Sequence, residues 1–204
     1  MIGFYNYTVW LTYIGMLSSV VGIGFACGGN LTAAVICLMF SGFCDMFDGI
    51  VARTKKDRTD EERRYGIQLD SLSDIVCFGV LPFVIGVCSG AREWWQIAIM
   101  ALFALAGLIR LAYYNVTEEI RQQQTSEKRK HYLGVPITTS ALTVPLLFCF
   151  EKLLGAHFPL AYTLLLLVNG ACFIVPIQVK KPTKTGLLIM LVLGVIFTAC
   201  ILIF

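Results

Sequence analysis

Residues 31–53 read LTAAVICLMFSGFCDMFDGIVAR, an apolar run that carries Asp45 and Asp48 near its end. A helix of this length can cross the hydrocarbon core of a bilayer, which is about 30 Å thick and takes roughly 20 helical residues. The run is continuous rather than alternating, and a helix satisfies its own backbone hydrogen bonds in lipid. The segment therefore predicts a membrane-spanning helix with acidic side chains close to one end.

The whole chain shares this apolar character. Of its 204 residues, 57% are hydrophobic and 14% are charged, too few charges to cover a soluble domain of this length. The length suits a single membrane domain, residues 1–204. No basic residue precedes Arg53, so we expect no signal peptide.

The eight cysteines all lie in apolar runs and form no C-x-x-C pair. We expect small buried apolar residues, with neither disulfides nor a zinc site.

Further apolar runs predict an all-α fold, a polytopic transmembrane bundle of six to seven spans. The count depends on the fifth run, which contains Pro136 and Pro145. The runs cover residues 7–27, 31–53, 67–89, 94–114, 133–151, 158–178 and 184–204.

Basic residues are distributed unevenly between the connecting segments. Segments 53–65, 115–132 and 179–184 hold 13 of the 16 Lys and Arg, and with seven spans all three lie on one side. The positive-inside rule makes this side cytoplasmic. The N-terminus is then expected inside and the C-terminus outside.

Four aspartates interrupt the apolar pattern at the cytoplasmic ends of spans 2 and 3. Asp45 and Asp48, at i and i+3, share one helix face, and Asp70 and Asp74, at i and i+4, share another. A helix–loop–helix connection would bring the two faces together, in the last turns of the second span and the first turns of the third.

Clustered carboxylates in a membrane helix need protonation, pairing with Arg, or a metal ion. Arg53 alone cannot neutralise four acids, and oxygen ligands suit Mg²⁺, Mn²⁺ or Ca²⁺. Four carboxylates could hold two divalent ions and clamp phosphate oxygens. The alternatives are a structural polar seam between helices and a cation pathway through a transporter.

The run Asp45-x2-Asp48-Gly49-x2-Ala52-Arg53, followed by Gly66-x3-Asp70-x3-Asp74, resembles the signature of the CDP-alcohol phosphotransferase family. All eight fixed positions are present in order. Twelve residues, 54–65, separate the Arg from the next Gly, where the family usually has eight, and we carry no substrate contact over to this loop.

Within that family, residues 69–82, 110–115 and 132–136 are similar to the CDP-diacylglycerol–serine O-phosphatidyltransferases. The resemblance implies that the serine hydroxyl attacks the lipid-linked phosphorus of CDP-diacylglycerol, so that phosphatidylserine forms and CMP leaves. It also implies Mg²⁺ or Mn²⁺, two ions per site, and a homodimer in the cell membrane. The positive-inside rule places the active site on the cytoplasmic side. No nucleic-acid partner is expected.

The resemblance also suggests a role for each matching position. Asp45, Asp48 and Asp70 would be metal ligands, and Asp74 both a ligand and the general base. Four positions would contact the nucleotide: Gly49, Ala52, Arg53 and Gly66. The small residues among these four also suit ordinary helix packing, and Arg53 also suits snorkelling at the membrane surface.

The acceptor side is predicted from residues on the same side of the membrane. Candidates for the acceptor or the lipid phosphate are Arg110, Asn115, Lys130 and Tyr132. Apart from Arg53 and Lys184, which stand at the ends of their runs, Arg110 is the only basic residue within a predicted span, which favours a small acceptor such as serine. Glycerol phosphate, inositol phosphate and choline are the alternative acceptors.

Overall fold

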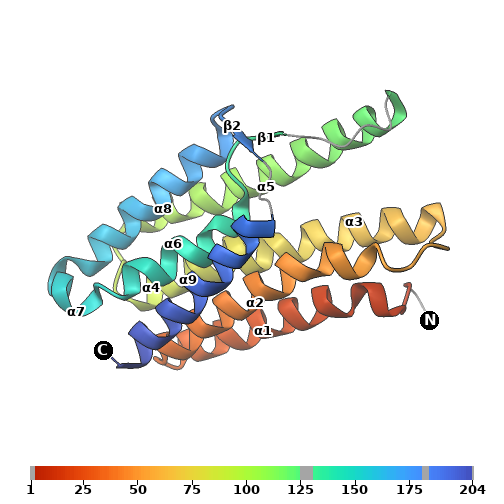
Figure 1. Ribbon diagram of the computed structural model, residues 1–204. Helices are drawn as coiled ribbons and strands as arrows, with labels where there is room; N and C mark the ends of the chain where they lie inside the picture. Colours follow the sequence, from red (N-terminus) through yellow and green to blue (C-terminus); the bar gives the residue numbers. More distant parts are fainter. Residues whose placement is uncertain (1–2, 125–130, 181–183, 204) are drawn as a thin grey trace.

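The computed structural model describes residues 3–124, 131–180 and 184–203 and shows a bundle of long helices (Figure 1). Among these residues, six helices are long and apolar enough to cross a membrane. Many of their apolar side chains are exposed, including Leu17 at 61% and Val195 at 71%. Such a surface suits lipid rather than water.

The first half of the chain forms three of these helices. A 3₁₀ turn, η1 (Tyr7–Val9), leads into α1 (Trp10–Cys27), which packs along α2 (Leu31–Ala52). The third is continuous from α3 (Asp60–Asp74) through a π-helical stretch, η2 (Ile75–Val80), into α4 (Leu81–Cys88).

The second half begins with α5 (Trp94–Gln124) and strand β1 (His131–Leu133). A 3₁₀ turn, η3 (Ile137–Thr139), continues into α6 (Ser140–Phe148), and the short α7 (Glu151–Leu154) and η4 (Gly155–His157) precede α8 (Phe158–Ile174). Strand β2 (Gln178–Lys180) pairs antiparallel with β1, and α9 (Lys184–Ile203) follows.

Small side chains let α1 and α2 approach closely. A Cβ on Gly22 would lie 2.8 Å from the Cβ of Cys37, and one on Gly15 would lie 3.1 Å from the Cβ of Cys44. Ser41 of α2 donates to the backbone carbonyl of Gly15 at 2.8 Å. Small residues and interhelical hydrogen bonds drive helix association in lipid.

The predicted fifth span, 133–151, is wrong in extent. The apolar helix here covers only Ile137–Phe148, about 18 Å at 1.5 Å per residue, shorter than a full membrane-spanning helix. Gly134 has a φ of +76°, and a Cβ added to it would lie 2.6 Å from the carbonyl oxygen of Phe173. The N–H of Gly134 donates to the carbonyl oxygen of Ile177, and the N–H of Val135 donates to that of Cys172. These bonds hold the segment against the C-terminal end of α8 and the residues just after it, so it does not start a helix.

Two other predictions are corrected. The third helix begins at Asp60 rather than residue 67, because Thr59 and Glu62 form a capping box at its start. The expectation of buried cysteines holds for Cys44 and Cys77, whereas Cys27 is exposed and the other five are half-buried.

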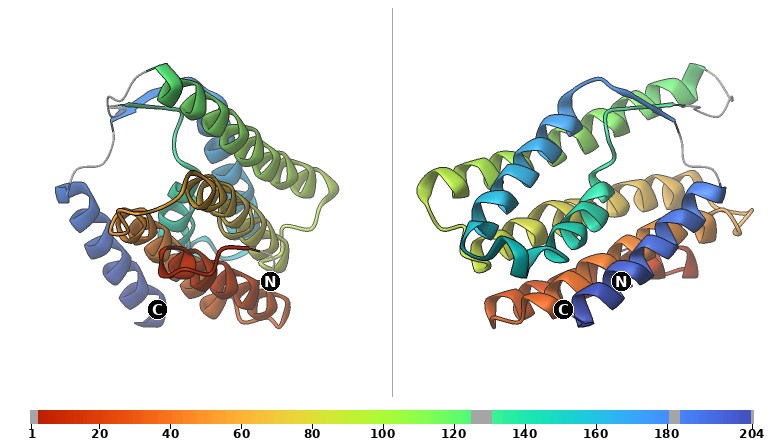
Figure 2. Two further views of the ribbon diagram at one scale, coloured as in Figure 1. Left: turned by 90° about the vertical axis from the view of Figure 1, so that its right-hand side faces the viewer. Right: turned by 60° about the vertical axis from the view of Figure 1, so that its left-hand side comes forward.

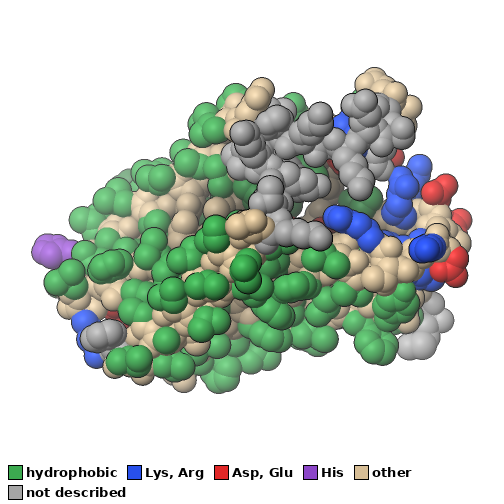
Figure 3. Space-filling view, viewed as in Figure 1, with side chains coloured by type: hydrophobic (Ala, Val, Ile, Leu, Met, Phe, Trp, Pro, Cys, Tyr) green, Lys and Arg blue, Asp and Glu red, His purple; other side chains and the backbone are tan. Residues whose placement is uncertain are grey.

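The last helix, α9, lies at the edge of the bundle beside α2 and α6 (Figure 2). The N-terminal and C-terminal ends of the chain lie at opposite ends of the bundle (Figure 1). Lys and Arg side chains gather where α2 ends and α3 begins, while hydrophobic side chains cover most of the visible remainder (Figure 3).

Candidate functional site

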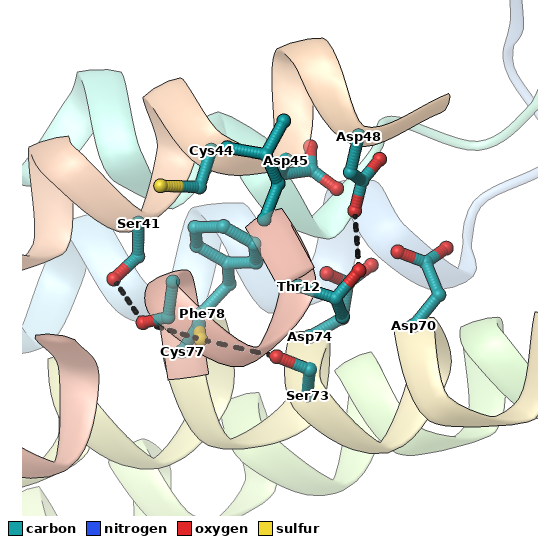
Figure 4. A pocket seen from close by; sticks show the side chains of 12 residues that line it. Thr12, Ser41, Cys44, Asp45, Asp48, Asp70, Ser73, Asp74, Cys77 and Phe78 are labelled. Carbon is teal, nitrogen blue, oxygen red and sulfur yellow. Dashed lines mark hydrogen bonds between the residues drawn. The ribbon is translucent and has the colours of Figure 1, made fainter. Parts of the chain in front are cut away.

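The end of α2 and the second half of α3 lie opposite each other, and both carry aspartates whose carboxylates point into the space between the two helices (Figure 4). One carboxylate oxygen from each of Asp45, Asp70 and Asp74 lies within 4.8 Å of the other two. Ligands on opposite sides of a cation with oxygen distances of about 2.1–2.5 Å are separated by about 4.2–5 Å. The three aspartates are therefore spaced to share one divalent ion.

Asp48 occupies a different position from the other three. Its carboxylate lines the same small pocket but accepts a hydrogen bond from Thr12 Oγ1 of α1, at 3.1 Å. It is not one of the three groups whose oxygens converge. Three of the four expected ligands thus come together, while Asp48 lies beside them.

Asp70 and Asp74 lie deeper in their helix than the sequence suggested. Because α3 starts at Asp60, Asp70 is about three turns from the helix start, and Asp74 is the last residue before the π-helical stretch. Asp74 is only 9% exposed, whereas Asp45 and Asp70 are half-buried. π-Helical turns are frequent at functional sites because they shift the register of side chains.

The ion pairs of the described residues lie outside this cluster. They join Lys55 to Glu62 and Arg121 to Glu118, and neither includes one of the four aspartates. The donors of the cluster are all oxygens, which fits a hard divalent cation.

A large open cavity of about 2080 Å³ adjoins the cluster, far above the roughly 300–1,000 Å³ of an ordinary ligand pocket. Asp45, Asp70 and Asp74 lie in its wall. Five arginines also line it, namely Arg53, Arg58, Arg63, Arg64 and Arg110. Apolar side chains of α2, α6 and α9 complete the wall, so the cavity combines a charged region with an apolar one.

The predicted nucleotide residues fall in this cavity, with one exception. Gly49, Ala52 and Arg53 line it, and a Cβ on Gly49 would meet only Arg53 Nη2, at 3.8 Å. Gly66 instead faces Arg58, whose Nη2 would lie 2.7 Å from an added Cβ. The space beside Gly66 is therefore occupied by a side chain of the loop between α2 and α3.

Two of the four acceptor candidates reach the same cavity. Arg110 and Asn115 line it, and Asn115 Nδ2 donates to Ser71 Oγ at 2.8 Å. Lys130 lies outside the described residues, and for Tyr132 only the backbone in β1 is described.

Sequence reasoning missed several residues at the site. Thr12 lies in the first helix, which has no acidic residue, and Arg58 lies in a loop without a motif. Ser71 lies next to Asp70, which the sequence had already singled out. Only Ser71, adjacent to Asp70 on the same helix, had a usable signal in the sequence.

A bundle of membrane-length helices, with a carboxylate cluster beside a large cavity that has charged and apolar walls, defines an integral membrane protein with a candidate cation site. The chain belongs to the CDP-alcohol phosphatidyltransferase family, whose sequence model matches residues 5–203.

Several proteins of known activity are similar to this chain in sequence. The chain is 37% identical over 114 residues to CDP-diacylglycerol–serine O-phosphatidyltransferase of Saccharomyces cerevisiae, covering 54% of this chain and 40% of that protein. It is 30% identical over 162 residues to archaetidylserine synthase of Methanothermobacter thermautotrophicus, covering 77% and 65%. A CDP-diacylglycerol–serine O-phosphatidyltransferase of Mycobacterium bovis is 26% identical over 204 residues, covering 94% and 69%. The chain thus spans less than two thirds of the first two relatives.

Proposed function

We propose that this protein transfers the phosphatidyl group of CDP-diacylglycerol to the hydroxyl of L-serine, giving phosphatidylserine and CMP. The observation that carries the proposal is the convergence of Asp45, Asp70 and Asp74 at a cavity with both arginine and apolar walls. A cytidine diphosphate linked to a diacylglycerol needs both kinds of surface. The names of the relatives support serine as the acceptor.

The proposed chemistry is a displacement at the phosphorus that carries the diacylglycerol. Asp74 removes the proton of the serine hydroxyl, the alcohol oxygen forms the new bond to phosphorus, and CMP leaves with the electrons of the broken P–O bond. Positioning and charge neutralisation account for most of the catalysis of such transfers. A divalent cation held by Asp45, Asp70 and Asp74 would supply charge neutralisation; Mg²⁺ or Mn²⁺ is proposed, with a second ion near Asp48.

The other residues of the cavity receive roles that fit their positions. Gly49 and Ala52 leave a smooth surface for the nucleotide, and Arg53 lies beside Gly49 where a phosphate could be bound. Arg110 and Asn115 are proposed for the serine carboxylate or the lipid phosphate. The proposal also includes a single domain, a homodimer, and a cavity that opens to the cytoplasm.

A phosphorylated acceptor is the second candidate, because the cavity is lined by further arginines besides Arg110. The sequence places only Arg110 in the interior of a predicted span, whereas α3 begins early enough to include Arg63 and Arg64. Both line the cavity, together with Arg53 and Arg58. Such a set of arginines also suits glycerol phosphate or inositol phosphate.

The test is to incubate the purified protein with CDP-diacylglycerol and Mn²⁺ or Mg²⁺ in the presence of serine, glycerol phosphate, inositol phosphate or choline. CMP release with serine supports the proposal. Release with another alcohol but not with serine would overturn the serine assignment and keep the chemistry. Cation flux in proteoliposomes without any CMP release would instead indicate a transporter.

A further inference from the structure

Arg58 lies in the loop between α2 and α3, and its guanidinium joins the two helices that carry the aspartates. Nη1 lies 3.3 Å from the carbonyl oxygen of Ala52, the last residue of α2. Nη2 donates to the carbonyl oxygen of Glu62, in the first turn of α3, at 3.2 Å. These two bonds place the guanidinium at the edge of the cavity that contains the carboxylate cluster.

Gly66 makes room for this guanidinium. An added Cβ would lie 2.7 Å from Nη2 and 3.9 Å from Cζ of Arg58. The first distance is shorter than a van der Waals contact, so any side chain at residue 66 has to displace Arg58. Because the group displaced is the tip of a flexible side chain, this displacement costs the fold little.

Arg58 has donors that the protein leaves unused. A guanidinium carries five N–H groups in a planar fork that matches phosphate oxygens. Two of its nitrogens bond to backbone carbonyls, and its Nε–H is buried without an acceptor among the described residues. The second N–H of Nη1 and that of Nη2 have no acceptor among the described residues, and Arg58 lines the cavity, so these groups can donate to a phosphate that lies there.

We propose that Arg58 binds a phosphate group of the cytidine nucleotide, and that Gly66 acts by admitting the Arg58 guanidinium rather than by touching the nucleotide. This inference rests on the proposed function. It gives segment 54–65, which is longer than the family usually has between the Arg and the Gly, a direct part in substrate binding.

The test compares Arg58→Ala, Arg58→Lys, Gly66→Ala and the double variant Arg58→Ala/Gly66→Ala. Binding of CDP in the presence of Mn²⁺ is measured by calorimetry in detergent, and KM and kcat for CDP-diacylglycerol are measured by CMP release. Lys56→Ala is the matched control, since Lys56 is an exposed cation of the same loop that does not line the cavity.

Arg58→Ala is expected to weaken CDP binding and raise KM for CDP-diacylglycerol by about 10- to 100-fold, the usual loss for a charge-assisted hydrogen bond, with KM for serine unchanged. Arg58→Lys keeps the charge without the fork and should fall between Arg58→Ala and the wild type. Gly66→Ala should show the defect of Arg58→Ala, and the double variant should be no worse than either single variant. Lys56→Ala should bind CDP as the wild type does.

Equal CDP binding by Arg58→Ala and the wild type would overturn the role of Arg58 while leaving the proposed function intact. Additive losses in the double variant would overturn the indirect role of Gly66, because they would mean that Gly66 contacts the nucleotide itself. Thermal melting of each variant separates these results from misfolding. A wild type that neither binds CDP nor releases CMP would refute the proposed function, and the Arg58 inference with it.

Discussion

At the residue scale, Asp74 is the most enclosed carboxylate of the cluster. It is buried at the junction of α3 and the π-helical stretch, with Asp45 and Asp70 close by. A buried carboxylate surrounded by others is a costly arrangement, and proteins keep such groups where they serve binding or catalysis. This position suits both of its proposed roles, cation ligand and general base.

Asp74→Asn is expected to lower kcat by at least about 100-fold, since a general base contributes about 10²–10⁴ in rate. Asparagine has the same shape, so the variant should melt as a folded protein in detergent. CMP release measures the loss. Asp57→Asn is the control, because Asp57 is exposed in the 54–59 loop and does not line the cavity. Near-normal turnover by Asp74→Asn would contradict the base assignment.

Cation binding should also appear as stability. Removing divalent ions with a chelator is expected to lower the melting temperature of the wild type, because an ion at 100 times its Kd stabilises the folded state by about 2.7 kcal/mol. Asp45→Asn and Asp70→Asn should lose this cation-dependent shift. Without cations they should be at least as stable as the wild type, since one of the repelling charges is gone.

A suitable control for the cation experiment is Glu151→Gln. Glu151 is an exposed acid in α7 and does not line either the small pocket or the large cavity. This variant should keep the full cation-dependent shift. Identical shifts in the wild type and in both aspartate variants would mean that the ion binds elsewhere.

At the element scale, close contacts between helices shape the cavity walls. A Cβ on Gly42 of α2 would lie 2.7 Å from the Cβ of Ala141 in α6, and this neighbour is a rigid side chain. An alanine here requires the two helices to move apart. The α2–α6 contact therefore positions two of the elements that line the cavity.

Gly42→Ala is expected to reduce the free energy of unfolding by about 1–3 kcal/mol through overpacking, partly offset by up to about 1 kcal/mol of improved helix propensity. Gly24→Ala in α1 is the matched control, because an added Cβ there meets nothing within 4 Å. It should be neutral or stabilising. Thermal or denaturant unfolding in detergent gives the comparison, and equal stability of the two variants would show that the α2–α6 contact yields without cost.

The element boundaries show which local signals the sequence carried. The second helix matches its predicted range within one residue, because its apolar run is long and ends at Arg53. The early start of α3 depends on a capping box in a charged segment that hydropathy alone treats as loop. The predicted fifth span becomes helical only at Ile137, because Gly134 and Val135 contact the distant end of α8 instead.

At the scale of the whole molecule, charge is concentrated at one end of an apolar bundle (Figure 3). The positive-inside rule predicts that the end carrying the basic segment 53–65 faces the cytoplasm. Lys152, near the start of α7, belongs to the opposite end (Figure 1).

Single reporter cysteines test this orientation. In a background in which the native cysteines are replaced, Lys56→Cys should resist a membrane-impermeant maleimide in intact cells and react after lysis. Lys152→Cys should react in intact cells. The reverse pattern would place the candidate site on the outer face and contradict the predicted topology.

The sequence by itself determined that this is a helical membrane protein, and it placed the aspartate pairs on two consecutive helices. Continuous apolar runs and fixed helical spacings are local properties, so they can be read without a structure. The family signature was equally local, and the match over residues 5–203 agrees with it.

Tertiary structure alone decided how the site is assembled. It brought Asp45, Asp70 and Asp74 together, held Asp48 with Thr12 of α1, and set Arg58 over Gly66. It also supplied α9 as a wall of the cavity, from the far end of the chain. In lipid, most faces of an apolar helix are chemically alike, so the sequence of one helix does not reveal which face meets which neighbour.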